Sequence, residues 1–320
     1  MSARDDALTR FLADHGTLIL DGGLATELEK RGWSLADPLW SAKLLIENPQ
    51  AIESVHHDYL VAGADCVIAA SYQATIEGFM QRGLARDQAE QTLSRSVELA
   101  RRACERYWKE IGSNTGRPHP LVAASIGPYG AARADGSEFH GHYGVSREVL
   151  IDFHRRRLAI LADAGADLFA CETIPSLCEA EAIATALREF PDVAGWISFT
   201  CADDKLVAHG EPLRECAHRL AEESQILAMG VNCTAPKHVA SLAREIRAVT
   251  SKPIVVYPNS GEEWDSATRG WKGASDIASF VDLAVGWHSL GVAVLGGCCR
   301  TGPEHIRELA HRIKSSSCKT

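Results

Sequence analysis

The chain has 320 residues, of which 46% are hydrophobic and 23% are charged, and its formal net charge is −9. This composition is that of an ordinary folded protein and excludes a disordered, collagen-like or coiled-coil chain. The negative charge provides no basic surface, so we expect neither nucleic acid nor an anionic membrane as a partner.

The N-terminal residues 1–16 are charged and predict a short amphipathic helix rather than a secretory signal. No apolar stretch of the sequence reaches the length of about 18 residues that a membrane span needs. We therefore expect a cytoplasmic protein whose thiols stay reduced. Most of its ten cysteines should then be small buried side chains.

Eight short apolar runs alternate with longer helical patterns along the chain. The runs cover residues 17–21, 66–71, 121–126, 167–172, 195–200, 227–232, 253–258 and 292–297. Near-continuous apolar runs are typical of parallel strands that are buried on both faces. Residues 146–165 are one of the helical patterns, and glycine marks helix exits at Gly63 and Gly165.

This alternation predicts an α/β fold, a single (β/α)8 TIM barrel that spans residues 1–320. A prior of about 150 residues per domain would allow two domains, but no linker or shift in composition divides the chain. A doubly wound open sheet is the alternative, and its Gly-rich dinucleotide turn is missing after the first strand. The active site of a TIM barrel lies at the C-terminal ends of the strands. We expect a Gly-rich loop at residues 131–144 to fold over that end.

Three cysteines stand at these strand ends. Cys233 follows the sixth strand, and Cys298 and Cys299 follow the eighth, directly after two glycines. Three thiolates suit zinc and leave its fourth tetrahedral position open, which is typical of a catalytic site. The alternative is three unrelated buried cysteines. The other seven are predicted to be packing residues: Cys66, Cys104, Cys171, Cys178, Cys201, Cys216 and Cys318.

The expected ligand set restricts the chemistry. Zinc with three thiolates carries a single net negative charge, so it is a weak Lewis acid toward water. A thiol substrate would bind as the fourth ligand and lose its proton, which would make it a better nucleophile. The added negative charge would attract a cationic electrophile such as a sulfonium. The site therefore indicates thiol alkylation.

Two carboxylates also end strands. Asp21 follows the first strand and Glu172 ends the fourth, where an unpaired carboxylate would be costly. We expect them to bind the ammonium group of an amino-acid thiol. The alternative is that they cap the following helices, a role that Thr173 or Ser176 could fill in place of Glu172.

Short segments spread in order over nearly the whole chain resemble the homocysteine S-methyltransferases, and specifically the short type that uses S-methylmethionine. The segments are DGGLATEL at 21–28, SYQAT at 71–75, CETIPSLCEA at 171–180, GVNC at 230–233, YPNSGE at 257–262 and GGCC at 296–299. The resemblance implies that Cys233, Cys298 and Cys299 hold zinc and thereby activate the thiol of homocysteine. Its implied substrate residues are Asp21, Gly22, Gly23, Glu172, Asn232, Tyr72 and Thr75.

One difference from related enzymes bears on the identity of the methyl donor. The related betaine-using enzymes are longer and place an aromatic residue after the strand-four glutamate, where this chain has Thr173. No residues remain here for the folate and cobalamin domains of the cobalamin-dependent methionine synthases. S-Methylmethionine and S-adenosylmethionine are the remaining donors. Tyr72 and Trp40 could contact a sulfonium through their rings or could simply be packing residues.

Other functions stay open at this point. A selenocysteine or selenohomocysteine methyltransferase would belong to the same family, and a zinc or thiol sensor would bind metal without turnover. A metal-dependent barrel hydrolase would need histidine ligands, for which His140 and His142 are the candidates. We interpret them as part of a mobile loop. The charge run 155–157, which is three arginines, is interpreted as a solvated helix face.

Overall fold

The computed structural model describes residues 6–261, 263–265, 270–272 and 276–317. Eight parallel strands form one sheet in the order β1-β10-β7-β6-β5-β4-β3-β2, and a parallel bridge between Leu20 and Cys66 joins its two edges into a barrel. The strands are β1 (Leu18–Ile19), β2 (Cys66–Ile68), β3 (Leu121–Ile126), β4 (Leu168–Ile174), β5 (Gly195–Phe199), β6 (Ile226–Asn232), β7 (Ile254–Tyr257) and β10 (Val292–Leu295). The predicted TIM barrel is confirmed.

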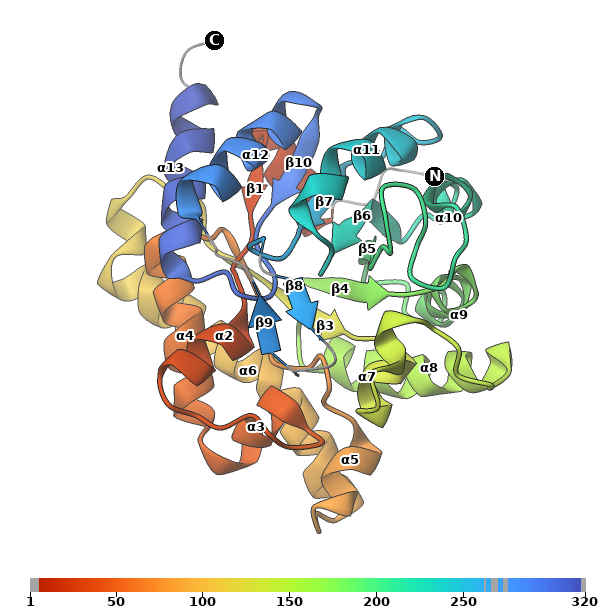
Figure 1. Cartoon of the computed structure of the whole chain (residues 1–320). Helices are drawn as coiled ribbons and strands as arrows, with labels where there is room; N and C mark the ends of the chain where they lie inside the picture. Colours follow the sequence, from red (N-terminus) through yellow and green to blue (C-terminus); the bar gives the residue numbers. More distant parts are fainter. Residues whose placement is uncertain (1–5, 262, 266–269, 273–275, 318–320) are drawn as a thin grey trace.

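Helices surround the barrel (Figure 1). The outer ring consists of α4 (Pro49–Ala62), α6 (Arg86–Glu110), α8 (Arg147–Asp163), α9 (Leu177–Leu187), α10 (Leu213–Leu220), α11 (Pro236–Arg247), α12 (Ile277–Ser289) and α13 (Pro303–Ser317). Shorter helices precede some of them: α2 (Leu24–Lys30), α3 (Leu44–Glu47), α5 (Ile76–Gln81) and α7 (Tyr129–Arg133). Gly63 and Gly165 follow α4 and α8 with φ angles of 122° and 80°, a conformation that glycine adopts without a steric penalty.

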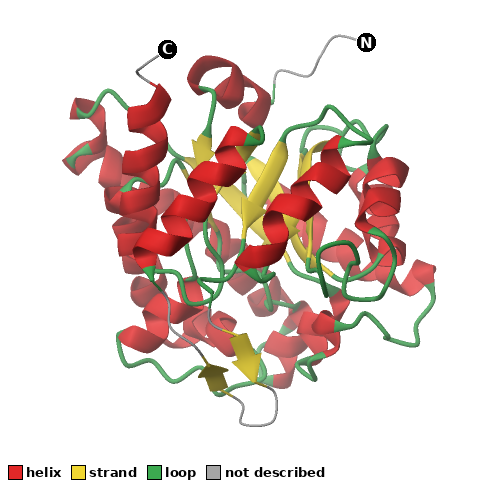
Figure 2. Cartoon of the chain, turned by 45° about the horizontal axis from the view of Figure 1, so that its top comes forward, coloured by secondary structure: helices red, strands yellow, loops and turns green. Residues whose placement is uncertain are grey.

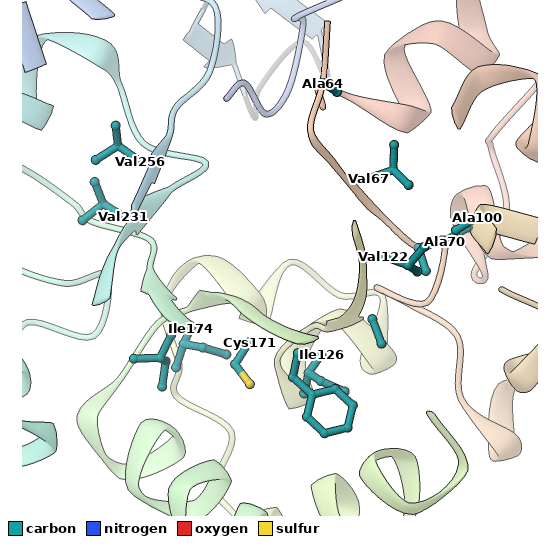
Figure 3. Close-up of a cluster of buried hydrophobic side chains, with 14 of the residues drawn as sticks. Ala64, Val67, Ala70, Ala100, Val122, Ile126, Cys171, Ile174, Val231 and Val256 are labelled. Atoms are coloured by element: carbon teal, nitrogen blue, oxygen red, sulfur yellow. The ribbon is translucent and has the colours of Figure 1, made fainter. Parts of the chain in front are cut away.

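Alternate residues of each strand pack on the two faces of the barrel wall. The outer layer, between strands and helices, includes Val67, Val122, Val231 and Val256 (Figure 3). The interior of the barrel is filled by a second apolar cluster that includes Trp196 and residues from the other strands. The predicted N-terminal helix, α1 (Ala7–His15), covers the end of the barrel at which the strands begin. Its buried Leu8 and Phe11 belong to this cluster.

Two connections differ from the sequence predictions. Residues 131–144 are only in part a loop, because α7 extends into them and Ser137–Phe139 form a 3-10 turn. The connection from β7 to α12 contains a hairpin that was not predicted, β8 (Glu263–Asp265) with β9 (Gly270–Lys272). The hairpin lies apart from the barrel strands (Figure 2). None of the described helices combines the length and apolar character that a membrane crossing requires.

The seven cysteines predicted to be packing residues divide into groups. Four are fully buried, as predicted: Cys66, Cys104, Cys171 and Cys216. Cys201 is partly buried. Cys178 is exposed, so the prediction is wrong there, because the residue lies on an outward face of α9. Cys318 lies outside the described residues.

Candidate metal and substrate site

Three sulfur atoms converge where β6 and β10 end. The Sγ atoms of Cys233, Cys298 and Cys299 lie within 4.8 Å of one another, and no other such group of metal-ligating side chains occurs in the described part of the chain. Cys233 Sγ and Cys299 Sγ are 3.7 Å apart. Only β7 separates β6 from β10 in the barrel, so residues far apart in sequence meet at one point. Such a cluster could bind a metal ion.

The end of β7 joins the two cysteine-bearing segments. The backbone N–H of Cys233 donates to the carbonyl of Tyr257 at 3.3 Å, and that of Cys298 donates to the carbonyl of Pro258 at 2.8 Å. The carbonyl of Cys299 accepts from the N–H of Ser260 at 3.1 Å. Cys233 has a φ of 50°, a left-handed conformation that is uncommon for a residue with a side chain. Backbone hydrogen bonds to the end of β7 and the loop after it therefore hold the two cysteine-bearing segments beside each other.

The three neighbouring thiols shift one another's pKa values. Hydrogen bonds from Cys233 and Cys298 hold the pKa of Cys299 well below its usual range. Hydrogen bonding to Cys298 and Cys299, together with burial, raises the pKa of Cys233. The three thiols therefore titrate as one coupled group. Because metal ligation requires deprotonated sulfur, a cation would release the remaining protons on binding.

Asp21 and Glu172 are both nearly buried beside this cluster, with exposures of 3% and 8%. Asp21 Oδ2 accepts the N–H of Ile68 at 2.9 Å, and burial raises the pKa of Asp21. Burial and the nearby Cys298 raise the pKa of Glu172 to about 8, partly offset by a hydrogen bond from Ser125 Oγ. Two buried carboxylates with raised pKa values form a suitable environment for a cation.

Neither carboxylate caps a helix. The side chain of Ser176 caps α9 by accepting the N–H of Glu179 at 3.3 Å, which removes that alternative for Glu172. The cap of α2 is Gly23, which has no side chain to contribute, and Asp21 is engaged with Ile68 instead.

Gly22 and Gly23 are packed too closely to carry a side chain. A Cβ atom on Gly23 would lie 2.7 Å from the carbonyl oxygen of Cys298, and one on Gly22 would lie 2.9 Å from the ring of Tyr59. Glycine is therefore needed at 23 for the loop after β1 to lie against the cysteine-bearing loop after β10. Thr75 Oγ1 accepts the N–H of Gly78 at 3.0 Å and caps α5, so the structure gives this residue a structural contact.

Tyr72 packs against a second aromatic residue. Its ring is 6.2 Å from that of Trp40, edge to face. Burial and the nearby Cys233 raise the pKa of the Tyr72 hydroxyl. Arg157 of α8 holds the backbone around Tyr72. Its guanidinium donates to the carbonyls of Ser71 and Tyr72 at 2.8 and 3.0 Å.

Of three polar side chains that follow or end β6 and β7, one is hydrogen-bonded and two have atoms for which the described part of the chain provides no hydrogen-bond partner. Asn232 is fully buried, and its amide bonds to Thr173 and Ser198. Asn259 Oδ1 and Ser260 Oγ, which follow β7, are buried without a hydrogen-bond partner among the described residues. A buried polar atom without a partner is costly.

The histidine ligands of the hydrolase alternative do not assemble. The rings of His140 and His142 are stacked with centroids 5.5 Å apart, and the N–H of His142 donates to His140 Nδ1 at 3.0 Å. Among the residues the structure describes, they belong to no group of three side chains whose ligand atoms lie within 4.8 Å of one another. The pair packs toward His209, with ring centroids of His142 and His209 4.4 Å apart.

Sequence reasoning missed several polar residues beneath the site. Tyr257 Oη accepts from Trp196 Nε1 at 3.0 Å and lies 2.7 Å from Ser198 Oγ. Ser125 on β3 contacts Glu172. A serine inside an otherwise apolar strand was the available signal, because a buried hydroxyl requires a polar partner.

Comparison with known proteins identifies relatives over nearly the whole chain. Residues 18–313 match the family model described as homocysteine S-methyltransferase. Homocysteine S-methyltransferase YbgG of Bacillus subtilis (strain 168) is 49% identical over 308 residues, which cover 96% of this chain and 98% of the relative. The homocysteine S-methyltransferase of Escherichia coli (strain K12) is 45% identical over 311 residues, covering 97% of this chain and 99% of the relative.

A solved structure agrees with the fold. The metallated form of the homocysteine methyltransferase MmuM from Escherichia coli superimposes with a TM-score of 0.85 at 44% identity, covering 95% of this chain and 99% of that one.

Proposed function

The chain belongs to the homocysteine S-methyltransferase family and transfers a methyl group to homocysteine, and we propose that it does so through zinc and a sulfonium donor. In this proposal Cys233, Cys298 and Cys299 hold the zinc. The product is methionine. The observation that carries the proposal is the convergence of these three sulfurs at one point of the barrel mouth.

The spacing of the sulfurs fits zinc. Two thiolates bound to a tetrahedral zinc at 2.3 Å each lie about 3.8 Å from one another. Cys233 Sγ and Cys299 Sγ are 3.7 Å apart. Three protein ligands leave one tetrahedral position for the substrate sulfur, and a zinc ion bound there would supply the charge that keeps the homocysteine thiol deprotonated at neutral pH.

Asp21 and Glu172 bind the ammonium group of homocysteine in this proposal. Their buried carboxylates lie near enough for Glu172 to raise the pKa of Asp21. A bound ammonium would relieve this repulsion and compensate the burial of both charges. The Ser125 hydroxyl orients one oxygen of Glu172. Gly22 and Gly23 allow the main chain after β1 to lie close to the cysteine loop.

We propose that the donor binds beside Tyr72 and Trp40. Their edge-to-face rings can contact a sulfonium through cation–π attraction. Thr173 stands where betaine-using relatives carry an aromatic residue, which favours a sulfonium over a quaternary ammonium. An anionic sulfur meeting a cationic methyl donor loses charge in the transition state, and a water-poor site strengthens that attraction.

We also propose that residues 1–320 form one homocysteine-binding barrel domain. Contacts between consecutive units continue from α1 to α13, and no linker divides the sequence. A cytoplasmic location belongs to the proposal, because the three clustered thiols must remain reduced to bind metal.

A donor assay tests the function. The zinc-loaded protein is incubated with homocysteine and with methyl-labelled S-methylmethionine, S-adenosylmethionine or betaine in turn, and labelled methionine is measured by mass spectrometry. We expect methionine from at least one sulfonium and none from betaine. The Cys178→Ser variant, altered at an exposed thiol away from the cluster, is the control that should retain activity. Absence of methionine with both sulfonium donors contradicts the proposal.

A further inference from the structure

Thr173 adopts an unusual backbone conformation directly after Glu172. Its φ is 59°, in the left-handed region, where a β-branched residue is a rare outlier. The pairing of β4 with β5 is irregular at the same place, with a register shift between Cys171 and Ile174. Such strain persists only where the surroundings enforce it, and it concentrates at functional sites. Some contact must therefore hold Thr173.

The side chain of Asn232 makes that contact. Asn232 Oδ1 accepts the backbone N–H of Thr173 at 2.7 Å, and Asn232 Nδ2 donates to Thr173 Oγ1 at 2.8 Å. Ser198 Oγ donates to the same Oδ1 at 2.8 Å. Both lone pairs of the amide oxygen are thus occupied by protein donors. Since Asn232 is also fully buried, it has no exposed surface with which to touch a substrate.

We infer that Asn232 is a positioning residue that acts through Thr173 to fix the Glu172 carboxylate relative to the Cys233 sulfur. Thr173 follows Glu172, and Asn232 precedes Cys233, so one amide links the two strand ends. Homocysteine must reach both groups at once, with its ammonium at one and its sulfur at the other. This inference rests on the proposed function, and it replaces the sequence prediction that Asn232 binds substrate.

Glycine at position 173 provides the decisive test. Glycine adopts positive φ freely, so a Thr173→Gly chain does not need the amide to hold its backbone. We expect Asn232→Ala to lower kcat/KM for homocysteine about tenfold or more, mainly through KM, as a misplaced contact does. The double variant Asn232→Ala/Thr173→Gly should recover most of this loss. If Asn232 contacted substrate, glycine at 173 would recover nothing and the two losses would multiply.

Matched controls separate positioning from general effects. Thr200 also lies at a strand end but has no positive φ, so Thr200→Gly in the Asn232→Ala background should recover nothing. Values of kcat/KM are compared at equal zinc content, because Thr200 Oγ1 donates to the carbonyl of Cys233 at 3.3 Å and its removal touches the metal site directly. Recovery by Thr200→Gly, or losses that multiply in the Thr173 double variant, overturns the inference.

A measurement without turnover keeps this inference separate from the proposed reaction. Urea unfolding of the wild type, the two single variants and the double variant gives a stability cycle that needs neither substrate nor donor. We expect Asn232→Ala to destabilise the chain less when residue 173 is glycine. Additive stabilities contradict the link between Asn232 and Thr173 even if methionine is formed. A non-additive cycle in a protein that makes no methionine contradicts only the proposed function.

Discussion

Arg156 and Arg157 are neighbours in α8, yet the side chain of Arg156 is 52% exposed whereas Arg157 is 2% exposed. The buried guanidinium donates to the carbonyl of Gly127 at 2.7 Å as well as to those of Ser71 and Tyr72. Burial lowers its pKa to about 10, so it remains charged at neutral pH. The interpretation of all three arginines of this run as a solvated face is therefore wrong for Arg157.

Replacing Arg157 should destabilise the barrel. In Arg157→Ala the carbonyls of Gly127 and Tyr72 lose this donor and that of Ser71 keeps only the N–H of Ala74, so we expect a loss of about 3–5 kcal/mol in the free energy of unfolding, measured in urea. Arg156→Ala removes a neighbouring exposed arginine and should change stability by less than about 0.5 kcal/mol. Similar losses in both variants would show that the buried hydrogen bonds are not the cause.

Metal content should depend on the sulfur cluster. We expect about one zinc per chain in the wild type and a large loss of zinc in Cys233→Ser, because a neutral hydroxyl is a poor replacement for a thiolate. Elemental analysis of the purified proteins measures this. Cys178→Ser should keep its zinc, since Cys178 is exposed and outside the cluster. Unchanged zinc in Cys233→Ser would remove that residue from the ligand set.

A methyl group added at Gly23, in the loop after β1, should disturb the sulfur cluster. The added Cβ would lie 2.7 Å from the carbonyl oxygen of Cys298, a backbone atom that cannot move aside independently. We expect Gly23→Ala to weaken zinc retention during dialysis against a chelator. Gly286 is the control, because it lies inside α12 and a Cβ there meets no atom within 4 Å. Gly286→Ala should retain zinc and gain up to about 1 kcal/mol in stability. Equal zinc loss from both variants would contradict the close approach.

The raised pKa of Glu172 should make the metal-free, reduced protein less stable as pH rises. Its pKa is about 8 in the folded chain, against about 4.3 for an ordinary glutamate. Between these values the folded chain holds a proton that the unfolded chain has lost. Stability due to this proton is therefore complete at low pH and disappears toward pH 8, with a slope of up to about 1.4 kcal/mol per pH unit.

Glu172→Gln cannot ionise and should lack this part of the slope. Urea unfolding of both metal-free proteins at a series of pH values measures the difference. We expect the variant to be the more stable of the two at pH 8, with the advantage vanishing as the pH falls. If the free energies of unfolding of the two proteins change with pH in parallel, burial does not raise the pKa of Glu172.

Local sequence pattern was sufficient for the barrel. The run at residues 121–126 was predicted as a strand and is found with the same bounds, because continuous apolar residues can only be buried on both faces. The three site cysteines were predicted from the same strand pattern, because they directly follow two strands that lie close together in a closed barrel. The exposure of Cys178 was not predicted, because it depends on which face of α9 meets its neighbours.

Features set by distant contacts could not be predicted. The left-handed conformation of Thr173 depends on the amide of Asn232, which is 59 positions away in the sequence. Likewise, the burial of Arg157 depends on carbonyls at positions as distant as Ser71, 86 residues earlier. The strands of the β8–β9 hairpin have only three residues each, which is too short for an alternating pattern to distinguish them from a loop.

The order in which the chain is synthesised gives the sulfur cluster one more property. Cys233 follows β6, whereas Cys298 and Cys299 follow β10, the last strand to be made and the one that joins β7 to β1. Because proteins are synthesised from the N-terminus, a growing chain has no complete ligand set until its barrel can close. A metal ion could therefore be held by all three sulfurs only after the segment that follows β10 has been made.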